Sequence, residues 1–452
     1  GCQPLLHSML ARLAPLNLHV GLRSTAAGPK PSMRCFLDFQ LPPVLSVPSS
    51  QTSRNPCNFA FRMKLKNDSH LAYCTNIHRG SSWSETLESL DLYTMRAKEK
   101  ICPTDPYAIG LRLSASAAAE LSEPYKLKAF QKWLDDRQCY IFTVNGFPYG
   151  DFHGKRVKED VYRPDWAMRD RVDYTKRLFD LICQIAPQGM EASVSTVPGS
   201  FKRFIDSEEQ LDAMRRNLSE CALYIDALSQ KTGRDLHLGL EPEPLCLFET
   251  SQETVKFMDQ LLGAGLAEPE IIQRRIGVNY DACHLAVEYE SAKESLERFL
   301  GQGIRISKIH LSSALKVADF SPATLARLRD FCDKVYLHQV VARSEAETLE
   351  RYEDLDVALE ARESGADMAE EWRIHFHIPL HRSPGSPLQS TNDHIQGVFD
   401  FLQTHDGFCR HFEMETYTWE VLPDDLGEGD VVDQLVREYE WTLQELVSRG
   451  LA

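Results

Sequence analysis

Acidic side chains and one histidine stand at or near the ends of four apolar stretches in the second half of this chain. Carboxylates crowded at an apolar site repel one another and lose hydration, and a divalent cation removes both penalties. Three carboxylates with one imidazole suit Mn²⁺, Mg²⁺, Co²⁺ or Zn²⁺ better than copper or an iron–sulfur cluster. The candidate ligands are Glu241 or Glu243 in 236–244, Asp281 in 276–282, His310 in 305–313, and Glu413 or Glu415 in 411–417. The pattern predicts one divalent metal ion.

Two of these positions stay ambiguous. Residues two apart on a strand face the same side, about 7 Å from each other, so Glu241 competes with Glu243 and Glu413 with Glu415. Each residue alone also has a plainer explanation. An aspartate after a strand often caps a helix, and a histidine in an apolar strand is often an ordinary core residue. The metal interpretation rests on all four stretches together.

The elements that would position these residues are short strands alternating with amphipathic helices. Eight such strands over about 350 residues predict a parallel (β/α)₈ TIM barrel, in which functional residues gather at the carboxyl ends of the strands. A doubly wound sheet is the alternative, but no Gly-rich phosphate loop follows the first strand. The predicted strands are 71–78, 108–114, 139–146, 192–198, 236–244, 276–282, 305–313 and 411–417, and the predicted helices are 84–98, 115–135, 168–187, 207–231, 250–264, 286–301 and 321–333.

One interval is too long for a barrel repeat. About 105 residues separate His310 from Glu415, whereas a repeat usually takes roughly 30–45. The interval contains strand-like pieces at 335–342 and 373–381 around an acidic segment, 344–371, that looks helical. We interpret 316–390 as an insertion on the catalytic face of the barrel.

Charge and composition exclude several classes of protein. The net charge of −16, with 43% hydrophobic and 26% charged residues, argues against a duplex nucleic-acid binder, which needs clustered Lys and Arg. No apolar run reaches the roughly 18–20 residues that span a bilayer. The twelve cysteines form no CxxC pair, as expected of reduced thiols in the cytoplasm.

The first 62 residues differ from the remainder. They hold six Lys or Arg against one acid, Asp38, and resemble an organelle transit peptide, which would place the protein in an organelle such as a plastid. Alternatively they are an unstructured extension or translated upstream sequence, with Met63 as the true start. Either way the barrel domain is predicted to occupy 63–452.

Several motifs resemble known families. "LGLEPEP", "YDACH", "KIHLSS" and "METY" are similar to motifs of xylose-isomerase-like barrels, which include sugar isomerases, ketose 3-epimerases and endonuclease IV. Longer segments, among them "HLAYCTNIHRGSSW", "FTVNGFPYGDFHG", "STVPGSFK", "HFHIPLH" and "METYTWEVLP", resemble the EboE-type metabolite traffic proteins from about Met63 to the C-terminus. That resemblance implies a part in making or exporting a secondary metabolite. It also implies partners among the other ebo gene-cluster products, including a prenyltransferase-like membrane protein.

The resemblance to ketose epimerases implies which residues act. Matched by motif, the metal ligands are Glu241, Asp281, His310 and Glu415. Glu241 and Glu415 would also transfer the proton. Substrate hydroxyls would be contacted by His284 and Glu249. The chain reads "HLSSALKV" after its seventh strand, unlike the epimerases or endonuclease IV, and the nuclease's extra histidines have no counterpart beyond His78 and His153. One metal is therefore favoured over a trinuclear nuclease site.

Three further residues are weaker candidates for substrate binding. Asn145 ends the third predicted strand, although "NG" is also a turn signal. His153 lies in "FPYGDFHG", a long loop suited to covering a substrate. His377 alternates with His375 on a predicted strand, which is equally consistent with an ordinary solvated strand.

Three functions remain open. The first is a metal-dependent isomerase or epimerase acting on a small polar hydroxy-carbonyl metabolite. The second is a non-catalytic protein that binds and hands on such a metabolite, and the third is an endonuclease IV-like phosphodiesterase. The sequence does not choose the substrate, the metal, or between a monomer and a homo-oligomer.

Overall fold

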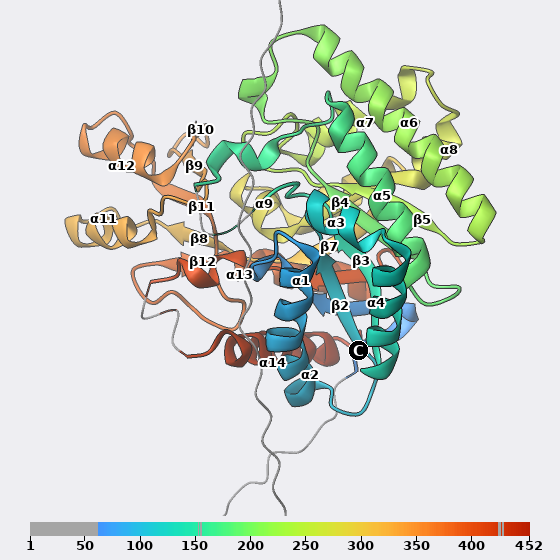
Figure 1. The fold of residues 1–452 in the computed structure, drawn as a ribbon. Helices are drawn as coiled ribbons and strands as arrows, with labels where there is room; N and C mark the ends of the chain where they lie inside the picture. The colour runs from blue at the N-terminus through green and yellow to red at the C-terminus, as the bar shows by residue number, and fades with distance from the viewer. Residues whose placement is uncertain (1–61, 152, 154–155, 424–425, 427–428) are drawn as a thin grey trace, which may run out of the picture. The chain divides into compact units, whose positions relative to one another are not determined.

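The computed structural model describes residues 62–151, 153, 156–423, 426 and 429–452. The predicted N-terminal extension, apart from Arg62, lies outside these residues. The central feature is a sheet of eight parallel strands in the order β1-β13-β7-β6-β5-β4-β3-β2. A parallel bridge between Cys74 and Gly110 joins the two end strands, so the sheet forms a nearly closed barrel (Figure 1). The strands are β1 (His70–Tyr73), β2 (Tyr107–Arg112), β3 (Cys139–Asn145), β4 (Ala192–Thr196), β5 (Leu236–Leu240), β6 (Ile276–Asp281), β7 (Ile306–Leu311) and β13 (His411–Met414).

This arrangement confirms the predicted (β/α)₈ barrel and excludes the doubly wound sheet. All eight predicted strands are present, and every residue in them is buried. Their carboxyl ends fall earlier than predicted, because the polar residues that follow the apolar runs turn into the loops of the barrel mouth. Burial on both faces explains the near-continuous apolar character of the strands.

Helices cover the outside of the barrel, and local signals explain where they begin. Ser82, Ser207 and Thr250 each form a capping box with the residue three positions after them, which satisfies free backbone N–H groups at the helix start. The helices are α1 (Trp83–Ser89), α2 (Met95–Ile101), α3 (Ala115–Leu121), α4 (Pro124–Asp136), α5 (Arg169–Ile185), α6 (Glu208–Thr232), α7 (Ser251–Gly263), α8 (Pro269–Arg275), α9 (Ala282–Val287), α10 (Ala292–Gly301), α13 (Asn392–Thr404) and α14 (Val431–Ser448).

Two predicted helices are divided in the structure. The predicted helix 115–135 is split into α3 and α4 at Pro124, which takes the first position of α4 because proline lacks the N–H that a helix interior needs. The predicted helix 286–301 is also wrong as a single element. Its first residues belong to α9, which begins at Ala282, and α10 starts afresh behind a Ser291 cap.

The long interval between β7 and β13, predicted to be an insertion, folds into a second sheet. Its five strands are antiparallel and lie in the order β10-β9-β11-β8-β12. A separate apolar core, which includes Phe331 and Trp372, packs beneath them. The elements are β8 (Ala314–Val317), α11 (Pro322–Leu328), β9 (Val340–Arg343), β10 (Leu349–Tyr352), α12 (Leu355–Glu363), β11 (Glu371–His377) and β12 (Gln389–Ser390).

The prediction for the acidic segment 344–371 was wrong in part. Its first half contains β10, which forms a hairpin with the preceding strand β9, and α12, capped by Asp354, is the helical part of the segment. Pairing with a neighbouring strand outweighs the helical preference of glutamate-rich sequence.

Strand β11 is attached to the barrel beside α9 (Figure 1). Arg373 donates to the carbonyl of Ala286 over 2.7 Å, and Tyr289 donates to the carbonyl of Glu371 over 2.9 Å. The guanidinium of Arg373 also lies 4.1 Å from the centre of the Tyr289 ring. These contacts attach the first half of β11 to α9 and to the turn that follows it.

Candidate metal centre

Four predicted residues meet at the carboxyl ends of neighbouring barrel strands. Glu241 follows β5, Asp281 ends β6, His310 lies near the end of β7, and Glu415 follows β13. One ligand atom from each lies within 4.8 Å of the others. All four side chains are buried, with exposures of 5% or less. The strand order places these residues side by side because β5, β6, β7 and β13 are consecutive in the barrel.

A single nitrogen of His310 lies at the centre of the group. Its Nδ1 is 2.9 Å from Glu415 Oε2, 3.1 Å from Glu241 Oε1 and 3.4 Å from Asp281 Oδ2. One ring nitrogen carries at most one proton, so it cannot donate to three carboxylates at once. Ligands about 2.0–2.2 Å from one ion lie roughly 2.9–3.5 Å apart, so the spacing fits donors that share a cation.

The oxygen atoms of the group also fit a cation. Asp281 Oδ1 accepts hydrogen bonds from Ser312 Oγ at 2.6 Å and from the N–H of His284 at 3.0 Å, so it caps α9 and is already satisfied. Asp281 Oδ2 and Glu241 Oε2 are buried and accept no hydrogen bond from the described residues. Buried polar atoms without partners are costly, and a bound ion would supply the missing partner.

The other nitrogen of His310 is held from below. Its Nε2 lies 2.9 Å from Glu413 Oε2, which also accepts from Lys308 Nζ over 2.6 Å. Lys308 and Glu413 are fully buried and lie one inward-facing layer beneath His310 and Glu415. A carboxylate behind a ligating histidine fixes its tautomer and orientation. Of the ambiguous pair, Glu415 therefore lies in the cluster and Glu413 supports it.

The crowding of charged groups shifts the pKa values of the cluster residues. Burial disfavours a charged His310, but the carboxylates of Glu415 and Glu241 outweigh it and raise the pKa of the ring well above its usual value. Burial likewise opposes ionisation of Asp281, yet the rings of His284 and His310 hold the pKa of its carboxyl well below the usual range. The negative charge of the cluster therefore requires a positive partner, either a proton or a metal ion.

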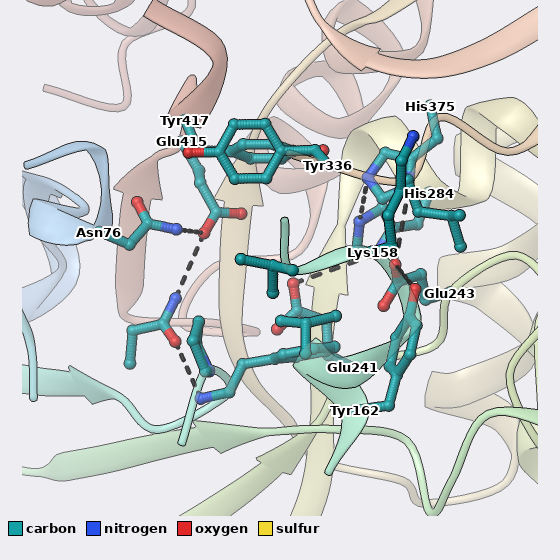
Figure 2. Close-up of a pocket in the computed structure, with 16 residues that line it drawn as sticks. Asn76, Lys158, Tyr162, Glu241, Glu243, His284, Tyr336, His375, Glu415 and Tyr417 are labelled. Carbon is teal, nitrogen blue, oxygen red and sulfur yellow. Dashed lines mark hydrogen bonds and ion pairs between the residues drawn. The ribbon is translucent and has the colours of Figure 1, made fainter. Parts of the chain in front are cut away.

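Two residues of the cluster, Glu241 and Glu415, line a pocket at the mouth of the barrel. Glu241 lies near the middle of the view, with Glu415 on one side and His284 on the other (Figure 2). Most of the remaining wall is aromatic and aliphatic. It is lined by Asn76, Asn145, Phe147, Pro148, Val157, Lys158, Val161, Tyr162, Glu243, Tyr336, Leu337, His375 and Tyr417.

Two amides hold Glu415 on its side of the pocket. Asn76 Nδ2 donates to Glu415 Oε1 over 2.6 Å, and Asn145 Nδ2 donates to the same oxygen over 3.2 Å. Asn145 was among the predicted substrate residues, whereas Asn76 was missed. The sequence offered a weak signal, since Asn76 stands just beyond the first strand in "YCTNIH", where barrel function is concentrated.

Glu243, His284 and His375 lie on the opposite wall of the pocket. Glu243, the other member of the first ambiguous pair, accepts from Tyr162 Oη over 2.6 Å, and burial raises the pKa of its carboxyl to about 7. His284, a predicted substrate residue, lines this wall. Its Nε2 lies 3.1 Å from Nε2 of His375, which comes from β11 of the insertion. The alternating histidines of "HFH" were the available signal.

The other predicted substrate residues lie elsewhere. Glu249 is paired with Lys202 and with Arg351, whose Nε donates over 2.7 Å, and it does not line the pocket. His153 contacts the carbonyl of Asn76 and the hydroxyl of Tyr336, and so lies behind the wall.

His377 is next to the cluster but not in its quartet. Its Nδ1 lies 2.6 Å from the carbonyl oxygen of Glu415, so the ring supports the backbone that carries this ligand. The predicted covering loop contributes Phe147 and Pro148 to the pocket, and parts of it (residues 152, 154 and 155) lie outside the described residues.

Among the helices that the structure describes, none combines the length and apolar character needed to cross a bilayer.

No known protein-family profile matches the chain, and no curated protein is significantly similar to it. Solved structures are similar over most of its length. A xylose isomerase-like TIM barrel protein from Mycobacterium smegmatis in complex with magnesium is 15% identical, with 86% of this chain and 94% of that one covered and a TM-score of 0.44. The IOLI protein with a binding zinc atom is 13% identical, with 84% and 98% covered and a TM-score of 0.43. A D-tagatose 3-epimerase-like protein is 12% identical, with 84% and 99% covered and a TM-score of 0.45. Because the identities and TM-scores are low, the barrel is assigned from the order of its own strands. The similar structures are not used to infer the reaction.

Proposed function

We propose that this protein is a metal-dependent isomerase or epimerase of a small hydroxy-carbonyl metabolite. The observation that carries the proposal is the convergence of three carboxylates on Nδ1 of His310. Glu241, Asp281, His310 and Glu415 would hold one divalent ion, Mn²⁺, Mg²⁺, Co²⁺ or Zn²⁺. A bound ion of this kind polarises a carbonyl and lowers the cost of charge on its oxygen.

Glu241 and Glu415 are the proposed proton-transfer residues. They reach the pocket from different sides, Glu241 from the end of β5 and Glu415 from beyond β13 (Figure 2). One carboxylate would take the proton from the carbon next to the carbonyl, and the other would return it on the second face. The amides of Asn76 and Asn145 fix Glu415 Oε1, which orients its carboxylate for this role.

The aromatic wall supports a small polar substrate. Tyr162, Tyr336 and Tyr417 line the pocket beside its carboxylates and amides, and aromatic rings next to polar groups can bind the apolar and polar surfaces of a polyol or sugar together. Lys158 also lines the pocket, but its ammonium is paired with Asp354 of the insertion.

A second candidate is a non-catalytic protein that binds the metabolite and hands it on. The resemblance to EboE-type proteins is compatible with either candidate, and it implies partners among the ebo gene-cluster products and a role in forming or exporting a secondary metabolite. The nine described cysteines are free thiols, which supports a reducing compartment such as the cytoplasm. Both candidates use the same pocket and differ in whether a proton is transferred.

Proton transfer can be tested by solvent exchange. The full chain, loaded with Mn²⁺, is incubated in D₂O with a panel of ketoses, aldoses and other hydroxy-carbonyl compounds, and deuterium is followed by NMR. We expect incorporation next to the carbonyl of at least one compound, lost by 10³-fold or more in Glu415→Gln and Glu241→Gln. Glu440→Gln, an exposed glutamate of α14, is the matched control. Metal binding without exchange on any compound would favour the binding protein.

A further inference from the structure

Two histidines in the pocket face each other in an unusual way. Nε2 of His284 and Nε2 of His375 lie 3.1 Å apart (Figure 2), and both rings are at least 95% buried. His284 belongs to α9 of the barrel and His375 to β11 of the insertion. Two ring nitrogens this close need either a proton or a cation between them.

The remaining nitrogen of each ring reveals its tautomer. Nδ1 of His284 lies 2.9 Å from the carbonyl oxygen of Pro242, and a carbonyl can only accept, so Nδ1 carries the proton. Nδ1 of His375 lies 2.8 Å from Oε1 of Gln339. The amide of Gln339 is oriented by its NH₂ group, which donates to the carbonyl of Pro244 over 3.2 Å. Its Oε1 therefore accepts from His375.

When both rings are neutral, neither Nε2 atom carries a proton, and the two lone pairs point at each other. Two imidazole nitrogens about 2.0–2.1 Å from one ion lie roughly 2.9–3.4 Å apart at bond angles of about 90–110°. The observed separation falls within this range. Each Nδ1–H donates to an oxygen, the carbonyl of Pro242 or the amide of Gln339, and acceptors of this kind hold ligating histidines in place.

A third donor is already present. A carboxylate oxygen of Glu243 and one ring nitrogen from each of His284 and His375 lie within 4.8 Å of one another. Glu243 is 5% exposed, and all three residues line the pocket, so an ion can reach them from its opening. Two imidazoles and a carboxylate suit Zn²⁺ or Co²⁺ better than Mg²⁺ or Ca²⁺.

The charge of the pocket points the same way. Glu241, Glu243, Asp281 and Glu415 place four buried carboxylates in one small space, whereas the carboxylate of Glu413 is balanced by Lys308. With Glu243 ionised, one divalent ion would leave excess negative charge in a site of low dielectric constant, which is costly. A second divalent ion would reduce that excess.

We propose that Glu243, His284 and His375 bind a second divalent ion, of the Zn²⁺ or Co²⁺ type, beside the ion of the main cluster. This inference rests on the proposed function, because it places the second ion in the same pocket. Since His375 comes from β11, the ion would also join the insertion to the barrel and complete the pocket only when the insertion is docked.

The test is metal stoichiometry. The full chain is stripped with a chelator, dialysed against excess Zn²⁺, freed of unbound metal and measured by mass spectrometry. We expect two ions per chain in the wild type, and one in His375→Ala and in Glu243→Gln. His405→Ala, which removes a histidine at the end of α13 outside the pocket, should keep two. Circular dichroism checks that each variant is folded.

If His375→Ala does not fold, titration of the wild type with Co²⁺ decides, since the visible absorbance should rise to two equivalents. Saturation at one equivalent, or two ions retained in His375→Ala, would overturn the second site and leave a proton on His284 as the bridge between the rings. One ion that is lost in Asp281→Ala would then still support the proposed function. A wild type that binds none would remove both.

Discussion

The ring of His310 joins two kinds of environment. Its Nδ1 faces three carboxylates in the pocket, and its Nε2 faces Glu413 in the layer below. The ion pair between Glu413 and Lys308 is fully buried. A buried pair of this kind is destabilising when one partner is removed, because the other charge is left without compensation.

Glu413→Gln should therefore affect both stability and metal binding. We expect a loss of about 3–5 kcal/mol in the free energy of unfolding and metal affinity weakened roughly 10–100-fold. Urea denaturation measures the first effect and metal titration the second. The double variant Glu413→Gln with Lys308→Met should recover much of the stability but not the affinity. A single variant within 1 kcal/mol of the wild type would contradict the role given to this pair.

At this scale the sequence indicated the quartet but not its supports. Glu241, Asp281, His310 and Glu415 stand at recognisable strand ends, and the structure brings them together. The alternation of a strand could not separate Glu241 from Glu243, because both face the same side. Asn76 was missed as a pocket residue because its role depends on contact with a residue 339 positions away.

At the scale of the elements, the contact between the end strands β1 and β2 closes the barrel. This contact, the seam, lies close to the buried pair of Lys308 and Glu413. Gly110 of β2 lies against Glu413 of this pair. A Cβ added at Gly110 would be 2.6 Å from the carbonyl oxygen of Tyr73 and closer still to Glu413 Oε1. Backbone and a buried, ion-paired carboxylate cannot move away freely, so glycine is needed here for close approach.

Gly110→Ala should consequently lower the free energy of unfolding by about 1–3 kcal/mol and weaken metal binding through Glu413. Gly263→Ala is the matched control, since a Cβ there would enter open space at the end of α7 and should leave stability unchanged or slightly raised. Chemical denaturation of both variants makes the comparison. Equal stabilities would show that the seam tolerates a side chain.

The elements of the barrel were predictable because each repeat carries its own signal. Apolar runs predicted the strands, and the amphipathic stretches between them predicted the helices. The insertion was recognisable by its length, but its internal arrangement was not, since β10 pairs only with β9 and the sheet has its own core. Strand pairing of this kind depends on neighbours more than on local composition.

Across the whole molecule, the C-terminal helix is tied to the insertion and to the end of β13 by one buried acid. Glu438 of α14 accepts hydrogen bonds from the N–H of Leu380 at 3.1 Å and from Thr416 Oγ1 at 2.7 Å. Burial raises the pKa of its carboxyl to about 7 from the usual 4.5. The folded state therefore favours the neutral acid.

A raised pKa fixes the sign of the pH dependence. The stabilising contribution of Glu438 is fully present below about pH 4.5 and is lost as the pH rises through about 7, amounting to roughly 3 kcal/mol. Glu438→Gln keeps an acceptor oxygen without the charge. It should be more stable than the wild type above pH 7, with a smaller change between pH 5 and pH 8 in urea denaturation. The same pH dependence in both proteins would contradict this assignment.

The central claim is that Glu241, Asp281, His310 and Glu415 bind a metal ion. Mass spectrometry of the full chain, after dialysis against excess Mn²⁺ or Zn²⁺ and removal of unbound metal, tests it most directly. The wild type should hold at least one ion per chain, and Asp281→Ala and His310→Ala should each lose one relative to it. Asp393→Ala, an exposed aspartate at the start of α13, should lose none. A wild type without bound metal under either condition, or variants that bind as much as it does, would contradict the claim.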